Sequence, residues 1–243
     1  MTIGANLGSM LTPIGNPQNL YLYGRSGMGA LSFVALMLPY AALSALMLAG
    51  AILLAFRKET VSCQVERPAA PPKKRLILYL ALFAVCLLTV SGVLPEGALL
   101  VIVLAAVLID RRELLAEVDY GLLLTFAAFF VFIGNMGRLP QFRGFLESVL
   151  TGNERIAAVA ASQVISNVPA ALLLSGFTDQ WRELIIGTNL GGLRTLIASI
   201  ASLIPYKQTA VRHPEKKGPY LIFFTVWNVV FLAVLLAASF LLG

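Results

Sequence analysis

Charged residues are scarce in this chain of 243 residues: 12% are Asp, Glu, Lys or Arg, and 58% are hydrophobic. A soluble domain carries about 25% charged residues. The composition and a mean hydropathy of +0.85 therefore indicate a polytopic membrane protein. One histidine, His213, and two cysteines, Cys63 and Cys86, are too few for a disulfide framework or a transition-metal cluster. We expect no enzyme and no cofactor, because no set of catalytic or metal-binding side chains is present.

Uncharged runs of about the length of a membrane span occur five times. They are Leu31–Phe56, Leu76–Pro95, Tyr120–Gly137, Ile156–Thr178 and Gly218–Gly243. A helix needs roughly 20 apolar residues to cross the hydrocarbon core, so the 13 uncharged residues of Gly97–Ile109 are short unless tilted. The net charge of +6 is typical of Lys and Arg in loops that set topology. We expect a multi-pass protein of the cytoplasmic (inner) membrane. Its expected partner is the lipid bilayer, and we expect no nucleic acid partner.

A basic linker divides the chain at residues 57–75. It contains six Lys or Arg and three Pro, and the positive-inside rule places it in the cytoplasm. Residues 1–56 are then the end of a first repeat, a broken helix with the span that follows. Residues 76–243 are a second repeat, with spans, a hairpin at about 141–178, a broken helix at about 184–206 and a last span at 219–242.

The apolar run Ile156–Thr178 is interrupted by SNVPA, Ser166–Ala170. Proline after Ser-Asn is a poor helix interior. The segment is either a span with a kink or a re-entrant hairpin that turns at Ser166–Pro169. The hairpin places the basic stretch Lys207–Lys217 inside, and the full span places it outside. The positive-inside rule therefore favours the hairpin.

A short motif occurs twice. Ile3–Asn16 (IGANLGSMLTPIGN) aligns with Ile186–Ser199 (IGTNLGGLRTLIAS) at an offset of 183, with seven identities in 14 positions. The identities include Gly, Asn and Thr, and the predicted topology makes the two copies cross the membrane in opposite directions. Inverted repeats of broken helices are typical of secondary transporters.

The physical reason for such a break is the chemistry of its backbone. An unwound stretch in a membrane persists only where it is buried in protein or lines a wet cavity. There its carbonyls can bind a cation, and the N-terminus of a half-helix can receive an anion. The alternative is close packing, because both copies contain G-x-x-x-G. Packing explains the glycines, but it does not explain Thr-Pro-Ile-Gly-Asn-Pro at Thr12–Pro17.

The candidate substrate- and ion-binding residues lie in the two breaks and at the hairpin turn. They are Asn6, Thr12, Pro13, Gly15, Asn16, Ser166, Asn167, Asn189, Gly192, Arg194 and Thr195. For Ser166 and Asn167 the alternative is a Pro-kink with two locally satisfied side chains. Arg194 is a charge at a costly depth, which either binds an anion, snorkels or pairs with an acid.

These motifs resemble the ion transporter superfamily, in particular its citrate-transporter-like anion permeases, which are related to divalent anion:sodium symporters and arsenite permeases. The resemblance rests on GANLGSMLTPIGNPQN, SNVPAALLLSGF and GTNLGGLRTLIASIASLI. It implies an all-α inverted-repeat transporter with a re-entrant hairpin and discontinuous helices. Ser166 and Asn167 would then bind substrate and ion. The loops Thr12–Pro17 and Gly192–Ser199 would complete two cation sites.

Three features depart from that pattern. Val168 follows the Asn where dicarboxylate symporters of the family have Thr, and Arg stands at position 194 where a small or apolar residue is expected. The first hairpin and the helices before it are missing ahead of Ile3. We therefore expect a C-terminal part of a transporter, working as a homodimer or complemented by an N-terminal part.

The expected function is secondary active transport of a small anion by alternating access, coupled to Na⁺ or H⁺. Two alternatives stay open: an arsenite or metalloid efflux permease, and a membrane fragment or assembly subunit that does not transport.

Overall fold

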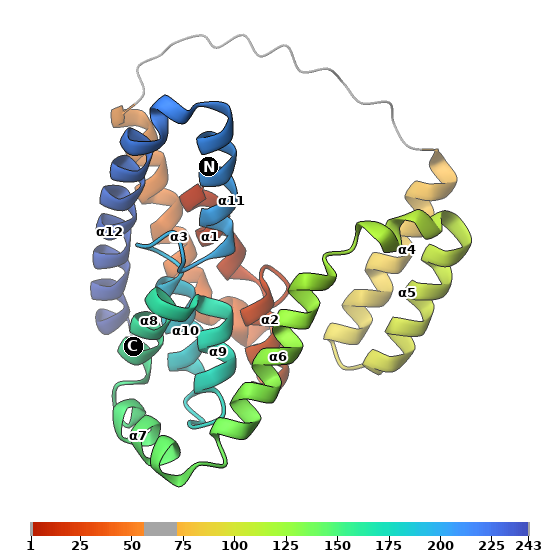
Figure 1. Cartoon of the computed structure of the whole chain (residues 1–243), viewed down its shortest axis with the longest axis horizontal. Helices are drawn as coiled ribbons and strands as arrows, with labels where there is room; N and C mark the ends of the chain where they lie inside the picture. The colour runs from red at the N-terminus through yellow and green to blue at the C-terminus, as the bar shows by residue number, and fades with distance from the viewer. Residues whose placement is uncertain (1, 56–71, 243) are drawn as a thin grey trace. The chain divides into compact units, whose positions relative to one another are not determined.

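The computed structural model describes residues 2–55 and 72–242. These residues form α-helices and short 3₁₀-helices, and no strand occurs among them (Figure 1). The all-α class predicted from the sequence is therefore confirmed. Two compact units are present, residues 1–55 with 124–243 and residues 56–123. Most of the predicted basic linker, together with Cys63, lies outside the described residues.

The smaller unit contains two packed helices and a 3₁₀ segment. These are α4 (Lys73–Val90), α5 (Glu96–Arg111) and η2 (Arg112–Glu117). The Arg75 guanidinium lies 3.2 Å from the Asp110 carboxylate and ties the start of α4 to the end of α5. The prediction that the linker extends to Arg75 is wrong. Lys and Arg are good helix formers and continue the helix beyond its apolar edge.

The larger unit carries the rest of the chain. Its N-terminal elements are α1 (Thr2–Gly8), η1 (Ser9–Leu11), α2 (Pro17–Ser26) and α3 (Ala30–Ala55). The central elements are α6 (Tyr120–Met136), which enters this unit at Leu124, α7 (Pro140–Leu150), α8 (Glu154–Ile165) and α9 (Asn167–Leu174). The C-terminal elements are α10 (Trp181–Gly191), α11 (Ile200–Arg212), η3 (Pro214–Lys216) and α12 (Lys217–Leu241).

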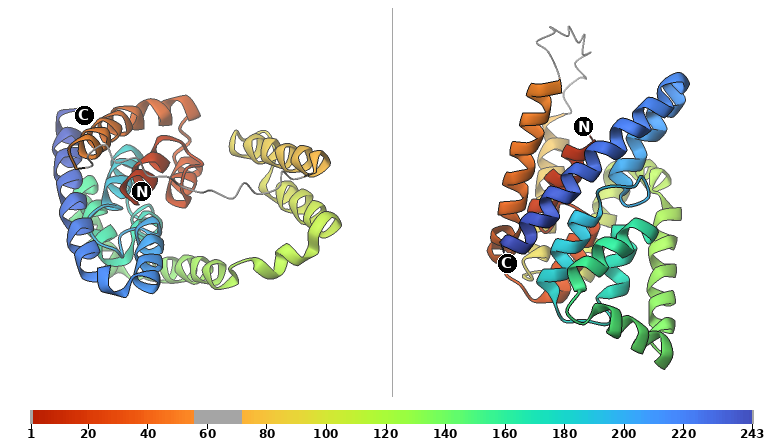
Figure 2. Two further views of the ribbon diagram at one scale, coloured as in Figure 1. Left: turned by 90° about the horizontal axis from the view of Figure 1, so that it is seen from above. Right: turned by 90° about the vertical axis from the view of Figure 1, so that its left-hand side faces the viewer.

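Two helices of the described residues are long and apolar enough to cross a membrane. They are Ala30–Leu54 and Pro214–Leu241, and they pack against each other (Figure 2). A third span is present if Tyr120–Met136 and Pro140–Leu150, bent by 100° at their break, count as one. These two helices correspond to the first and last predicted spans. Each helix begins and ends within one to five residues of the predicted bounds.

Both copies of the repeated motif form a broken helix. The first is α1 with η1, a break at 12–16, and α2; the second is α10, a break at 192–199, and α11. The half α1 packs against α11 and the half α2 packs against α10, so the two broken helices run antiparallel. The second ends later than predicted. Residues 207–212, expected in a basic loop, extend α11 because Lys, Gln, Ala and Arg favour helix.

The segment around Ser166 folds into two short helices that pack against each other. At 1.5 Å per residue, α8 with 12 residues and α9 with 8 are about 18 and 12 Å long. Neither reaches across a hydrocarbon core of about 30 Å. The predicted turn at Ser166–Pro169 is too long. The break is Ser166 alone, and Pro169 lies in the first turn of α9, where its missing N–H has no helical partner to lose.

Close contact between α8 and α10 explains the glycines of the second motif copy. A Cβ at Gly187 would lie 2.6 Å from the Arg155 carbonyl oxygen, and one at Gly191 would lie 2.7 Å from the Ser162 Cβ. At Gly8, the first-copy counterpart of Gly191, nothing lies within 4 Å. The packing alternative for G-x-x-x-G therefore holds for the second copy, where it joins one arm of the hairpin to α10.

Candidate functional site

The tip of the hairpin is hydrogen-bonded to the break of the second broken helix. The backbone N–H of Asn167 donates to the Ala198 carbonyl oxygen at 3.0 Å, and the Ser166 hydroxyl donates to the same oxygen at 3.4 Å. Ser166 has φ +73°, which costs about 1–3 kcal/mol in a residue other than Gly. Two features predicted separately from the sequence, the hairpin tip and the second break, therefore meet.

The first broken helix reaches the same place through Asn6. A Cβ at Gly192 would lie 2.8 Å from Asn6 Nδ2 and 3.0 Å from Asn167 Nδ2. Both asparagines are buried, and Asn6 Nδ2 has no hydrogen-bond partner in the described residues. The side-chain amide of Asn167 forms no hydrogen bond within residues 2–55 and 72–242 either. Two neutral donors therefore converge on the space that Gly192 leaves by lacking a side chain.

We name the contact between the first break and α10 the first crossing. Three asparagines are joined there in a closed ring of hydrogen bonds. Asn189 donates from Nδ2 to Asn19 Oδ1 at 2.6 Å, and Asn16 donates from Nδ2 to Asn189 Oδ1 at 3.1 Å. The backbone N–H of Asn19 donates to Asn16 Oδ1 at 2.9 Å. The predicted candidates Asn16 and Asn189 are thus brought together, but a ligand would have to displace these hydrogen bonds.

The contact between α1 and the second break is the second crossing. Ser199, the N-cap of α11, donates from Oγ to Asn6 Oδ1 at 3.2 Å and accepts from the backbone N–H of Ala201. Its helix N-terminus carries partial positive charge. The second crossing therefore combines a helix N-terminus with the unpartnered amide nitrogen of Asn6.

The first break is tightly folded on itself. The Thr12 carbonyl accepts from Asn19 Nδ2 at 3.3 Å and from the Gly15 N–H at 3.1 Å. A Cβ on Gly15 would collide with the Ser9 carbonyl oxygen, so glycine is required there. Pro13 is buried, and Thr12 and Gly15 are exposed. The expectation of a free carbonyl is therefore wrong at Thr12, because the amide of Asn19 already occupies it.

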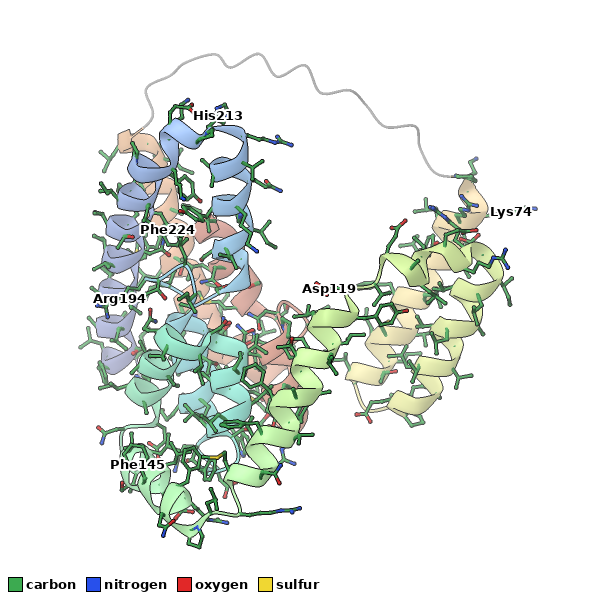
Figure 3. The ribbon with its side chains drawn as sticks, in the orientation of Figure 1. Lys74, Asp119, Phe145, Arg194, His213 and Phe224 are labelled. Atoms are coloured by element: carbon green, nitrogen blue, oxygen red, sulfur yellow. The ribbon has the colours of Figure 1, made fainter. Side chains whose placement is uncertain are left out.

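Arg194 does not join the buried polar groups. Its side chain is exposed, its backbone has φ +91°, and it forms no ion pair with a carboxylate of the described residues (Figure 3). Thr195 is closer to the hairpin: its hydroxyl lies 3.5 Å from the Gln163 carbonyl oxygen and accepts from the Ala198 N–H at 3.1 Å. Of the two candidates, Thr195 braces the break and Arg194 points away from it.

Gln163 is a residue of this region that sequence reasoning missed. Its Nε2 donates to the Gly191 carbonyl at 2.7 Å and to the Val159 carbonyl at 3.2 Å, which fixes the orientation of the amide. The oxygen Oε1 is buried and has no hydrogen-bond partner among residues 2–55 and 72–242. It lies beside the C-terminus of α10, where helix carbonyls carry partial negative charge. An amide oxygen in this position can coordinate a cation or accept a hydrogen bond. Its position one turn before the Ser-Asn tip was the available signal.

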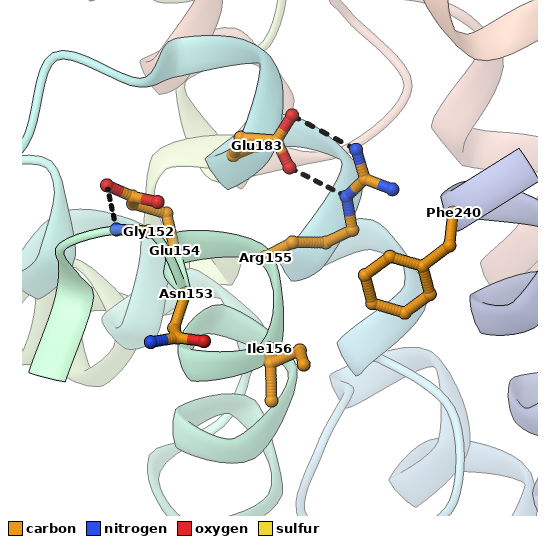
Figure 4. A pocket seen from close by; sticks show the side chains of 7 residues that line it. All are labelled: Gly152, Asn153, Glu154, Arg155, Ile156, Glu183 and Phe240. Carbon is orange, nitrogen blue, oxygen red and sulfur yellow. Dashed lines mark hydrogen bonds and ion pairs between the residues drawn. The ribbon is translucent and has the colours of Figure 1, made fainter. Parts of the chain in front are cut away.

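The buried Arg155 and the partly buried Glu183 form an ion pair at the base of the hairpin (Figure 4). Arg155 donates from Nε and Nη2 to the two Glu183 oxygens at 2.7 and 3.0 Å, and from Nη1 to the Ser239 carbonyl. Its guanidinium stacks 5.3 Å from the centre of the Phe240 ring. The hydrogen bonds to Glu183 raise the pKa of Arg155, which lies outside the two candidate spans.

This ion pair joins three helices: Arg155 lies in α8, Glu183 in α10, and the Ser239 carbonyl in α12. Arg155 and Glu183 line a small pocket of about 220 Å³. All three donor nitrogens of Arg155 already have partners, so the pair acts as a clamp rather than as a ligand site.

Arg155→Met is expected to lower the free energy of unfolding by about 3 kcal/mol, because Glu183 loses its buried partner. The measurement is thermal unfolding of the purified protein in detergent. Arg143→Met is the matched control. Arg143 forms an exposed i,i+4 pair with Glu147, worth about 0.3–0.5 kcal/mol. Equal losses in the two variants would contradict the clamp.

A family model and two curated relatives match this chain. The family model described as citrate transporter matches residues 1–178. An uncharacterized transporter of Methanocaldococcus jannaschii is 39% identical over 206 residues, which cover 83% of this chain and 55% of that protein. The inner membrane protein YbiR of Escherichia coli is 34% identical over 205 residues, with the same two coverages.

The chain spans about half the length of these curated relatives. No solved structure matches it. The family model matches most of the chain. The matched residues begin with the first broken helix and end with the hairpin. The chain belongs to the citrate transporter family.

Proposed function

We propose that this protein carries out secondary active transport of a small anion across the cytoplasmic membrane by alternating access. The observation that carries the proposal is the convergence of the hairpin tip and both broken helices around Gly192. Asn6 Nδ2 and Asn167 Nδ2 lie within 3.0 Å of its Cβ position, buried and free to donate. Because the two groups are neutral donors, they suit anionic oxygen. The chain covers half of its relatives, so the proposal concerns the transporter to which these residues belong.

The coupling ion is Na⁺ or H⁺ in this proposal. Neutral amides supply no positive charge to balance an anion, and Arg194 points away. A co-transported cation would supply that charge. Gln163 Oε1 is buried next to the C-terminus of α10 and lacks a partner in the part of the chain that the structure describes, so it is the oxygen best placed to receive the cation.

Alternating access requires a body that moves and a scaffold that does not. The hairpin arm α8 and helix α10 are joined by glycine contacts and by the Arg155–Glu183 pair. They are the natural moving body, carrying the tip and the second break together. The helices α3 and α12, which pack against each other and are long enough to span, are the natural scaffold, and the moving body touches α12 where Arg155 donates to the Ser239 carbonyl.

The test is uptake by proteoliposomes that contain the purified protein. Radiolabelled citrate, succinate or sulfate is supplied outside, with an inward gradient of Na⁺ or of H⁺. Accumulation above the outside concentration, abolished by an ionophore that collapses the gradient, is the expected result. Absence of uptake for all three anions under both gradients would contradict the proposal. Export of arsenite instead would favour metalloid efflux.

A further inference from the structure

The corner where α11 leads into α12 is strongly basic. Residues 207–217, which we name the basic corner, contain four Lys or Arg and one Glu, a net charge of +3 with His213 neutral. Glu215, the one acid, lies 3.5 Å from the His213 ring. The other charged residues are all exposed, and none of them forms an ion pair with a carboxylate of residues 2–55 and 72–242. These four unpaired cations are Lys207, Arg212, Lys216 and Lys217.

The basic corner is a folded surface rather than an irregular loop. The helix α11, the 3₁₀-helix η3 and the helix α12 follow one another through it, and η3 packs against both helices (Figure 3, where His213 is labelled). The rings of Tyr206 and Tyr220 lie 6.1 Å apart and join α11 to α12 beside the corner. The Tyr220 hydroxyl is 3.1 Å from the Thr2 hydroxyl of α1. The cations therefore stand on an ordered backbone.

The place of the basic corner along α12 puts it at the membrane surface. The candidate span Pro214–Leu241 begins inside the corner. A charge is costly in the hydrocarbon core, so Lys and Arg at the end of a span lie among the lipid headgroups, where Tyr is also enriched. The positive-inside rule assigns this end of the span to the cytoplasm. The leaflet on that side carries the negative surface potential of anionic lipids.

One face of α11 combines the charge of the corner with exposed apolar side chains. Ile204, Lys207 and Val211 follow one another at spacings of three and four residues, so they lie along one face of the helix. Ile204 is 52% exposed and Val211 is 81% exposed. A soluble phosphate would contact the charge and leave both apolar side chains in water. A phospholipid would contact the charge with its headgroup and cover the apolar side chains with its acyl chains.

We propose that the basic corner binds the headgroup of an anionic phospholipid of the cytoplasmic leaflet. The lipid phosphate meets the unpaired Lys and Arg side chains, and the acyl chains lie along Ile204 and Val211. This inference goes beyond transport, because it names a lipid partner and depends neither on the substrate nor on the coupling ion. Each Lys or Arg near an anionic surface strengthens binding by about fivefold.

The test is thermal unfolding of the purified full chain in micelles of detergent and phosphatidylcholine, with phosphatidylglycerol titrated in. Phosphatidylglycerol should raise the unfolding temperature, because a ligand that binds the folded protein stabilises it. The mole fraction that gives half of the rise measures the affinity. Neutralising the corner should increase that mole fraction at least about 25-fold, fivefold for each of two cations that one headgroup contacts. The variant carries Lys207→Gln, Arg212→Gln, Lys216→Gln and Lys217→Gln.

The matched control removes the same amount of charge from exposed arginines of the larger unit that lie outside the basic corner. It should keep the parent's response to phosphatidylglycerol. Substitutions at exposed positions change stability little, so both variants should unfold near the parent's temperature in phosphatidylcholine alone. The control carries Arg25→Gln, Arg138→Gln, Arg143→Gln and Arg182→Gln.

Three results would overturn the proposal. The first is a neutralised corner that responds to phosphatidylglycerol as the parent does, and the second is an equal loss of response in the control. The third is inorganic phosphate that raises the parent's unfolding temperature as far as the lipid does, since the site would then bind a soluble anion. A further measurement needs no variant. At 1 M salt the Debye length falls to about 3 Å, so the parent's preference for phosphatidylglycerol over phosphatidylcholine should disappear. A preference that persists at that salt concentration would also contradict the proposal.

Discussion

Asn167→Ala is expected to reduce anion uptake at least about 10-fold while leaving the protein folded. Asn167 is 3% exposed, and its side-chain amide has no hydrogen bond to lose within the described residues. Its Nδ2 faces the space beside Gly192 together with Asn6. A hydrogen bond to a charged ligand is worth about 1.5–3 kcal/mol, a factor of roughly 10 to 150 in affinity. The measurement is the initial rate of uptake against substrate concentration in proteoliposomes.

Asn228→Ala is the control for that experiment. Asn228 is equally buried, at 1% exposed, but it lies in α12 and donates to the Phe224 carbonyl of its own helix. Its replacement should leave the substrate dependence of uptake unchanged. If Asn167→Ala transports with the parent's rate and affinity, the hairpin tip is not part of the site. Equal unfolding temperatures of Asn167→Ala and the parent protein would show that a loss of uptake is not a loss of fold.

Gly191→Ala is expected to destabilise the protein by about 1–3 kcal/mol, the usual cost of adding a methyl group to a packed interior. The new Cβ would lie 2.7 Å from Ser162 Cβ and 3.1 Å from Val159 Cα, both in α8. Neither atom can move without displacing the hairpin arm. The variant should therefore also weaken uptake, because the tip shifts away from the second break. Thermal unfolding in detergent measures the first effect, and the uptake assay measures the second.

Gly8→Ala provides the matched comparison, because Gly8 is the counterpart of Gly191 in the first motif copy. Nothing lies within 4 Å of a Cβ at Gly8. Alanine is favoured over glycine in a helix by about 0.5–1 kcal/mol, so this variant should be as stable as the parent or slightly more stable. Similar destabilisation by Gly8→Ala and Gly191→Ala would contradict the packing difference between the two copies.

The breaks in the helices could be predicted because they depend on local chemistry. The family resemblance implied a second break at Gly192–Ser199, and the break occurs at residues 192–199. Ser199 ends it by capping α11, and Asn16 ends the first break by capping α2. These are interactions within a few residues, which sequence patterns describe well.

Contacts between distant residues could not be predicted in this way. The Arg155–Glu183 pair joins residues 28 apart in sequence, and neither residue has a local feature that marks burial. Charged residues near apolar runs are usually solvated, so the sequence offers no reason to pair the two. The same limit affected Arg194, whose charge suggested a ligand role although its side chain is exposed. Asn19 was missed because its side chain bonds to Asn189, 170 residues away in the sequence.

The central claim is that the substrate binds where the hairpin tip, the second break and Asn6 of the first broken helix meet. The most direct measurement is the alkylation rate of Ser166→Cys by N-ethylmaleimide, in a protein with Cys63→Ser and Cys86→Ser. Ser166 is half-buried at the tip, so the introduced thiol is within reach of the reagent. Citrate at ten times its dissociation constant should slow the reaction about 11-fold, because bound substrate covers the tip. An alkylation rate that citrate and every other transported anion leave unchanged would contradict the account.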